Sequence, residues 1–107
     1  MPPYHSLDAL HEAVRREAVQ LSRGADHRRL DLGYSEAEVH QCLLALTEHH
    51  FRKTYAYDQG MCDDYLLSWA HMNQDGGTQR DDLYIKVKLT PGPNGDLVAV
   101  ISFHLEQ

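Results

Sequence analysis

The chain has 107 residues and a formal net charge of −6, and its 42% hydrophobic and 24% charged residues are close to the average of globular proteins. This length allows one small domain, spanning residues 1–107, and the composition excludes disordered and fibrous classes. No apolar run reaches the ~20 residues of a membrane span, and Met-Pro-Pro-Tyr-His is not a signal peptide. We therefore expect a soluble cytoplasmic protein with no membrane contact.

The acidic charge is shared evenly by the two halves of the chain. Proteins that bind nucleic acid through its phosphates usually present a basic surface, so any such surface here must be a local patch. The two cysteines, Cys42 and Cys62, do not make a disulfide framework, and no Cys or His pair has the spacing of a zinc site. We expect no metal and no cofactor.

The first half of the chain has the pattern of helices. An apolar stripe with a 3.6-residue period runs from Leu7 to about Ala18, and Ser6 precedes it as a suitable N-cap. Val19–Leu21 could form a short strand. Residues 25–32 could add a turn of helix, with Gly33 as its C-terminal cap.

The clearest helix is predicted over Ser35–Thr47. Ser35 and Glu38 have the spacing of a capping box, and apolar residues then recur on one face. Cys42 lies on that face and is expected to be buried.

The second half changes to a period of two, which is typical of β-strands. The predicted strands are 51–57, 65–71, 83–89 and 97–105, with turns at 73–77 and 91–95. Helices followed by a meander of strands predict an α+β domain, with N-terminal helices packed on one face of an antiparallel sheet of about four strands.

Alternation along residues 83–89 places Leu83 and Ile85 toward the core and Tyr84, Lys86 and Lys88 on the other side.

On the last strand, Phe103 has the same parity as Leu97 and Ile101. The same alternation predicts that His104 shares its side with Val98 and Val100. Residues 83–89 and 97–105 are expected to pair as a hairpin, which would bring Tyr84, Lys86 and His104 onto one surface.

Strand 51–57 could contribute Lys53 and Tyr55 to that surface, or Arg52 and Thr54 instead. Lysine, tyrosine and histidine on an open face suit RNA cleavage without a metal, which needs charge stabilisation at phosphorus and two proton transfers. From the pattern alone, a solvated strand face is the simpler interpretation.

Two acidic pairs, Asp63-Asp64 and Asp81-Asp82, leave open a metal-dependent enzyme. Their spacing matches no coordination pattern. We therefore interpret them as solvated turn residues.

A set of short motifs occurs in a recognisable order along the chain. They are Leu32-Gly33-Tyr34, Leu43-Leu44-Ala45-Leu46-Thr47, Phe51-x-Lys53, Asp63-x-Tyr65, Leu83-Tyr84-Ile85-Lys86 and Val100-Ile101-Ser102-Phe103. This order resembles the MqsR family of type II toxin–antitoxin toxins, which have a RelE/ParE-like fold. The similarity extends from about Leu30 to His104.

The resemblance implies a metal-independent, sequence-specific mRNA endoribonuclease that acts on single-stranded mRNA. It also implies a cognate antitoxin, a helix-turn-helix DNA-binding protein encoded next door. Lys53 matches the family's catalytic lysine and Tyr84 its tyrosine, while His104 replaces a lysine. Lys53 would stabilise the charge of the phosphorane, and Tyr84 or His104 would transfer protons. Residues that would contact the RNA are His5, Arg52, Tyr55 and Lys86.

Several positions depart from the family pattern. Where the family has Trp-Gln-Asp-Val-Tyr, this chain has Met61-Cys62-Asp63-Asp64-Tyr65, so Cys62 stands at a functional glutamine. The lysines that end the family pattern are absent, and the chain is acidic where the family is basic. The alternative is therefore a catalytically degenerate RelE-like binding module that is retained for antitoxin pairing or regulation.

Overall fold

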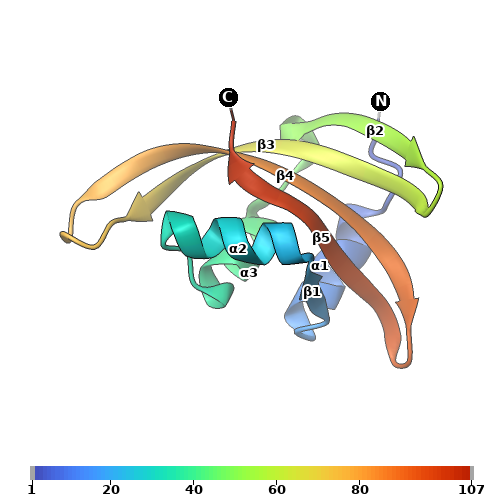
Figure 1. Cartoon of the computed structure of the whole chain (residues 1–107). Helices are drawn as coiled ribbons and strands as arrows, with labels where there is room; N and C mark the ends of the chain where they lie inside the picture. Colours follow the sequence, from blue (N-terminus) through green and yellow to red (C-terminus); the bar gives the residue numbers. More distant parts are fainter. Residues whose placement is uncertain (1, 107) are drawn as a thin grey trace.

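In the computed structural model, which describes residues 2–106, three α-helices pack on one side of a five-stranded sheet (Figure 1). The elements are α1 (Leu7–Arg15), β1 (Val19–Leu21), α2 (Arg23–Leu32), α3 (Glu36–Ala45), the 3-10 helix η1 (Glu48–His50), β2 (Phe51–Tyr57), β3 (Gly60–Met72), β4 (Thr78–Gly92) and β5 (Gly95–Leu105). The sheet arches over the helices, so that one of its faces is covered and the other is open. The predicted α+β class is confirmed.

The strand order is β1-β5-β4-β3-β2, and every neighbouring pair is antiparallel except β1 with β5. The sheet therefore has five strands within residues 2–106, not about four. The fifth is β1, the short strand that was considered possible at Val19–Leu21, and it pairs with β5 from Val19 opposite Val98 to Leu21 opposite Val100. Three residues give a weak periodic signal, and this strand owes its place to backbone pairing along the edge of β5.

Each α-helix begins after a serine whose hydroxyl accepts a backbone N–H, which satisfies a donor that has no partner inside the helix. Ser6 accepts from Ala9 at 3.2 Å and Ser22 accepts from Ala25 at 3.0 Å. The predicted starts after Ser6 and Ser35 are confirmed. Helix α1 ends earlier than predicted, at Arg15.

The predicted capping box at the start of α3 is only half present. Ser35 accepts the N–H of Glu38 at 3.1 Å, but the Glu38 carboxylate does not return to the backbone of Ser35. It accepts from Trp69 Nε1 at 3.0 Å and contacts His71 Nδ1 at 2.9 Å. Because α3 packs against β3, stronger partners on the sheet compete for this carboxylate. The C-cap of α2 is as predicted, with Gly33 at φ 83°.

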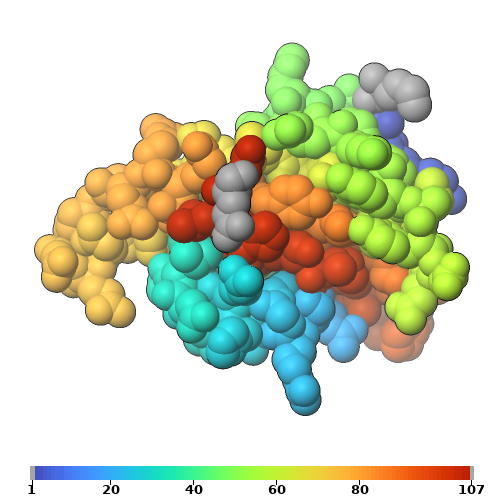
Figure 2. All heavy atoms as spheres, turned by 45° about the horizontal axis from the view of Figure 1, so that its top comes forward, coloured from blue at the N-terminus to red at the C-terminus, as the bar shows by residue number. Residues whose placement is uncertain are grey.

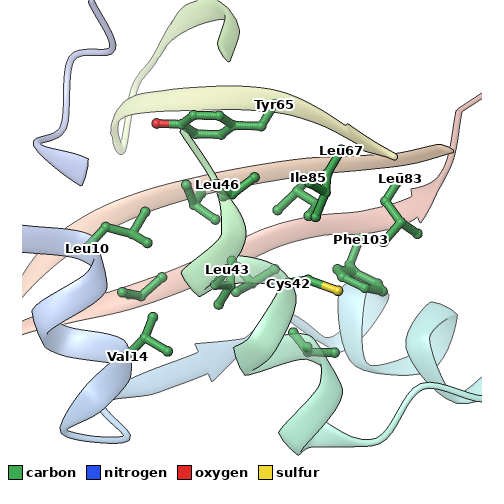
Figure 3. Close-up of a cluster of buried hydrophobic side chains, with 14 of the residues drawn as sticks. Leu10, Val14, Cys42, Leu43, Leu46, Tyr65, Leu67, Leu83, Ile85 and Phe103 are labelled. Atoms are coloured by element: carbon green, nitrogen blue, oxygen red, sulfur yellow. The ribbon is translucent and has the colours of Figure 1, made fainter. Parts of the chain in front are cut away.

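The hydrophobic core lies between the helices and the covered face of the sheet. Figure 3 shows Leu10 of α1 and Leu43 of α3 pointing toward the side chains of β3, β4 and β5. Cys42 is buried in the same cluster, as predicted. Burial of this apolar layer is the main favourable contribution to folding and fixes which side of the sheet stays open.

A β-bulge in β5 corrects the predicted side-chain alternation. Lys86 pairs with Ser102, but the next residue, Val87, pairs with Val100, so Ile101 is an additional residue in the strand. The parity of the strand changes at this point. Val98 and Val100 consequently face the core together with Phe103, contrary to the prediction, whereas His104 keeps the predicted side.

Strands β3 and β4 are longer than predicted because they include the acidic pairs. Asp63, Asp64 and Asp81 are 0%, 3% and 6% exposed, so their interpretation as solvated turn residues is wrong. Asp63 accepts the hydroxyl of Thr54, and Asp81 accepts that of Tyr34 at 2.6 Å. These partners permit carboxylates to be buried inside a sheet.

Candidate functional site

The side of the sheet that faces away from the helices, here called the outer face, carries the candidate site. Its members come from four adjacent strands, and Figure 2 turns part of this face toward the reader, with β2 in green, β4 in orange and β5 in red. They are Lys53, Tyr55 and Tyr57 on β2, Asp64 on β3, Tyr84 and Lys86 on β4, and His104 on β5.

Lysines and tyrosines interleave on the outer face. Lys86 Nζ donates to the hydroxyl of Tyr57 at 2.7 Å and lies 4.5 Å from the ring centroid of Tyr55. Lys53 Nζ lies 5.0 Å from the same Tyr55 ring. Contacts of this kind stabilise an ammonium group against an aromatic face without neutralising its charge. The arrangement keeps two positive charges close to one aromatic ring.

All three lysines of the chain, Lys53, Lys86 and Lys88, lie on strands β2 and β4 of this sheet. Lys88 Nζ donates to the backbone carbonyl of Gln59 at 3.1 Å. None of the three forms an ion pair with any of residues 2–106. A chain of net charge −6 therefore concentrates un-neutralised positive charge on one face.

Tyr84 and His104 stand opposite each other on β4 and β5, and their rings stack with centroids 5.0 Å apart and an interplanar angle of 17°. His104 Nδ1 lies 2.8 Å from the carbonyl oxygen of Leu105. Since a carbonyl can only accept, this contact requires the hydrogen on Nδ1. In the neutral ring, Nε2 then keeps a lone pair that can accept a proton.

Asp64 lies among these groups, with Lys53 opposite it on β2 and Lys86 opposite it on β4. It is 3% exposed, and its Oδ1 has no hydrogen-bond partner among residues 2–106. Burial raises the pKa of Tyr84, and the nearby carboxylate of Asp64 and the neighbouring Tyr55 raise it further. The phenol of Tyr84 is therefore protonated at neutral pH.

Of the residues expected to contact RNA, His5 lies apart from this group, and Arg52 is engaged with an acidic residue beyond the end of β5. Arg52 sits at an irregularity in the pairing of β2 with β3, and its guanidinium is 4.0 Å from the Glu106 carboxylate. The backbone N–H of His5 donates to Asp63 at 2.8 Å, and its Nε2 is 2.7 Å from the carbonyl oxygen of Met61. Because Asp63 and Asp64 are adjacent in a strand, they point to opposite sides of the sheet, so His5 is not on the outer face.

A hollow of about 450 Å³ adjoins the outer face at the β2–β3 turn. Its lining includes Tyr57, Cys62, Lys88 and the bulged Ile101. Burial raises the pKa of the Cys62 thiol, and this effect exceeds the opposing influence of Lys88 and Lys86. Cys62 is thus a neutral thiol at pH 7 and not a charged nucleophile.

Sequence reasoning did not assign Tyr57 or Asp64 to the site. Both could have been identified from strand parity and strand pairing. Tyr57 has the same parity as Lys53 and Tyr55 on β2, and strand pairing places Asp64 directly opposite Lys53. Asp64 was not assigned to the site because two consecutive aspartates are typical of a solvated turn.

Within residues 2–106, no three or more His, Cys, Asp or Glu side chains gather where they could hold a metal ion. The acidic pairs that suggested a metal are split by strand alternation and by separate hydrogen-bond partners. In the same described part of the chain, no helix has the length and hydrophobicity that crossing a bilayer requires.

Fold and outer face together define a small α+β domain with a cationic, tyrosine-rich sheet surface. Residues 2–105 match the family described as motility quorum-sensing regulator, toxin of MqsA. The chain belongs to this family, and it is thus a toxin of a toxin–antitoxin system in which MqsA is the antitoxin. A search of curated proteins finds no match. The family resemblance inferred from the ordered motifs is confirmed.

Proposed function

We propose that this toxin is a metal-independent endoribonuclease that cleaves single-stranded mRNA at its outer face. The observation that supports the proposal is the gathering of all the lysines, un-neutralised and interleaved with tyrosines, on one side of an acidic chain. Ammonium groups bind phosphates, and exposed aromatic rings stack on unpaired bases. Single-stranded RNA offers both.

The reaction we propose is an internal transphosphorylation. The ribose 2′-oxygen attacks the adjacent phosphorus and loses its proton, the bond from phosphorus to the 5′-oxygen breaks, and that oxygen takes up a proton. The products are a 2′,3′-cyclic phosphate and a 5′-hydroxyl. No metal or redox partner is needed to balance this step, and one proton enters the protein for each proton that leaves it.

The geometry supports distinct roles for three side chains. His104 accepts the 2′-OH proton at Nε2, because its Nδ1 is occupied by the Leu105 carbonyl. Tyr84, protonated and stacked against His104, donates to the departing 5′-oxygen. Lys53, with Lys86 near it across the Tyr55 ring, stabilises the charge that develops on the phosphorane.

The test is incubation of purified protein with a mixed-sequence single-stranded RNA in EDTA, followed by mapping of cut sites and end groups. We expect cleavage with cyclic phosphate ends that disappears in Lys53→Ala. Arg80→Ala is the matched control, because it removes one exposed cation from the far part of β4 and should leave cleavage intact. Intact RNA with folded wild-type protein would overturn the proposal.

That negative result would favour the alternative, a degenerate module that binds its antitoxin but does not cleave RNA. Expression in cells separates the two further: the nuclease should arrest growth, and Lys53→Ala should not. We also propose that the antitoxin is a helix-turn-helix DNA-binding protein encoded beside the toxin gene. Co-expression of the neighbouring gene should restore growth and yield a stable complex.

A further inference from the structure

We propose that Asp64 is a positioning residue of the outer face, whose buried carboxylate holds the Tyr84 hydroxyl in place as the proton donor. The inference rests on the nuclease function proposed above. It assigns a role to a side chain that the sequence pattern had suggested was a solvated turn residue.

The location of Asp64 is the first argument. It stands on the central part of β3, opposite Lys53 on one neighbouring strand and Lys86 on the other. Tyr84 is two residues before Lys86 on β4 and therefore lies diagonally across from Asp64, within reach of a long side chain. Asp64 is therefore next to three groups with proposed roles in phosphate or proton chemistry, namely Lys53, Lys86 and Tyr84.

The buried side chain of Asp64 also carries an energetic cost. A carboxylate that is 3% exposed, with one oxygen lacking any hydrogen-bond partner among residues 2–106, is expensive to bury. Neither lysine opposite it approaches closely enough to form an ion pair. An apolar side chain would fill the same place at less cost, so the fold alone gives no reason for an aspartate here.

The groups around the Tyr84 phenol show what Asp64 could do chemically. The phenol faces Tyr55 from β2 and Asp64 from β3. Lys86, on the same strand as Tyr84, has its Nζ 5.8 Å from the centroid of the Tyr84 ring, and His104 of β5 stacks on that ring. Asp64 is the one carboxylate in this set. An adjacent negative charge opposes the loss of the phenolic proton. Asp64 thus raises the pKa of Tyr84 beyond the effect of burial.

A titration tests this role without any reference to RNA. We would label tyrosine with ¹³C, assign Tyr84 by its absence in Tyr84→Phe, and follow its ring resonance with pH in wild type and Asp64→Asn. Asparagine has nearly the same shape but no charge, so the pKa of Tyr84 should fall by roughly one unit or more. Asp58→Asn, an exposed aspartate in the β2–β3 turn, should leave that titration unchanged.

The activity of the same variants supplies the functional part of the test. Asp64→Asn should lower kcat at least tenfold, with little change in KM, and move the alkaline limb of the pH–rate profile to lower pH. Asp64→Glu should recover part of the loss because it restores the charge. An unchanged Tyr84 titration, or a profile in Asp64→Asn that matches wild type, would overturn the proposal. A shifted titration in a wild-type protein that leaves RNA intact would instead overturn the nuclease function and leave the Asp64–Tyr84 coupling standing.

Discussion

Asp63, the neighbour of Asp64, allows a direct test of whether a buried carboxylate in the sheet stabilises the fold through its hydrogen bonds. Its side chain points toward the helix side of the sheet and is fully buried. Oδ1 accepts the N–H of Tyr4 at 3.0 Å and the hydroxyl of Thr54 at 2.5 Å, and Oδ2 accepts the N–H of His5 at 2.8 Å. This one carboxylate fastens the N-terminal segment to the β2–β3 hairpin.

The substitution Asp63→Asn removes the charge and one acceptor while preserving the shape. If the amide oxygen keeps the two bonds of Oδ1, the amide nitrogen then faces the N–H of His5, and two donors meet. Loss of one hydrogen bond to a charged group costs about 1.5–3 kcal/mol, and an unsatisfied buried donor adds about 1–3 kcal/mol. We expect a total loss of roughly 2.5–6 kcal/mol, which is a large share of the ~5–15 kcal/mol by which a small domain is stable.

Urea denaturation followed by the fluorescence of Trp69, the only tryptophan of the chain, measures this loss. The corresponding fall in Tm is about 4–8 °C per kcal/mol for a domain of this size. Amide exchange of Tyr4 and His5 should accelerate in Asp63→Asn. The matched control is Asp64→Asn, which removes a buried charge whose Oδ1 has no hydrogen-bond partner among residues 2–106 and should be no less stable than wild type. Equal effects of the two substitutions, or a loss below ~0.5 kcal/mol in Asp63→Asn, would refute the reasoning.

Three further outcomes follow from named contacts. Tyr34→Phe should cost about 1.5–3 kcal/mol in urea denaturation, because it removes the buried bond to Asp81 and keeps the ring stacked on His71; a variant as stable as wild type would contradict this. Burial raises the pKa of the Cys42 thiol and of the Tyr34 phenol, so these groups lose their protons at lower pH in the unfolded state than in the folded state. The free energy of unfolding should therefore decline as pH rises above ~8.5. A flat profile from pH 7 to 10 would contradict this expectation. Lys53→Ala should reduce the slope of log Kd against log salt for a non-cleavable 2′-O-methyl RNA by about 0.7, as expected for one lost phosphate contact; fluorescence polarisation measures the slope, and an unchanged value would show that Lys53 does not contact phosphate.

Much of the fold could be predicted from local patterns. Serine caps and the change from a period near 3.6 to a period of two predicted the helix starts and the main strands. The failures occurred where distant partners decide the outcome. Glu38 contacts Trp69 and His71 on β3 instead of closing the capping box. Val19–Leu21 was predicted as a possible short strand, but its place beside β5 in the same sheet was not predicted. Neither partner can be recognised from the segment itself.

The candidate site was predicted in part for a similar reason. Tyr84, Lys86 and His104 were placed on one face by hairpin pairing, and the structure has them there. The position of His104 did not depend on the part of β5 where the prediction was wrong, because the bulge at Ile101 lies before it. The parity argument failed only for residues on the other side of that bulge, where an extra residue reverses the alternation.

The net charge of the chain illustrates why composition is a weak guide to a binding surface. Electrostatic interactions in solution are screened over roughly 8–10 Å, so an RNA phosphate responds to the groups near it and not to a total of −6. The lysines of the outer face contact tyrosine rings, a hydroxyl and a carbonyl, and they form no ion pair with residues 2–106. The same acidic composition that argued against RNA binding would therefore restrict such binding to the face where Tyr84 and His104 lie.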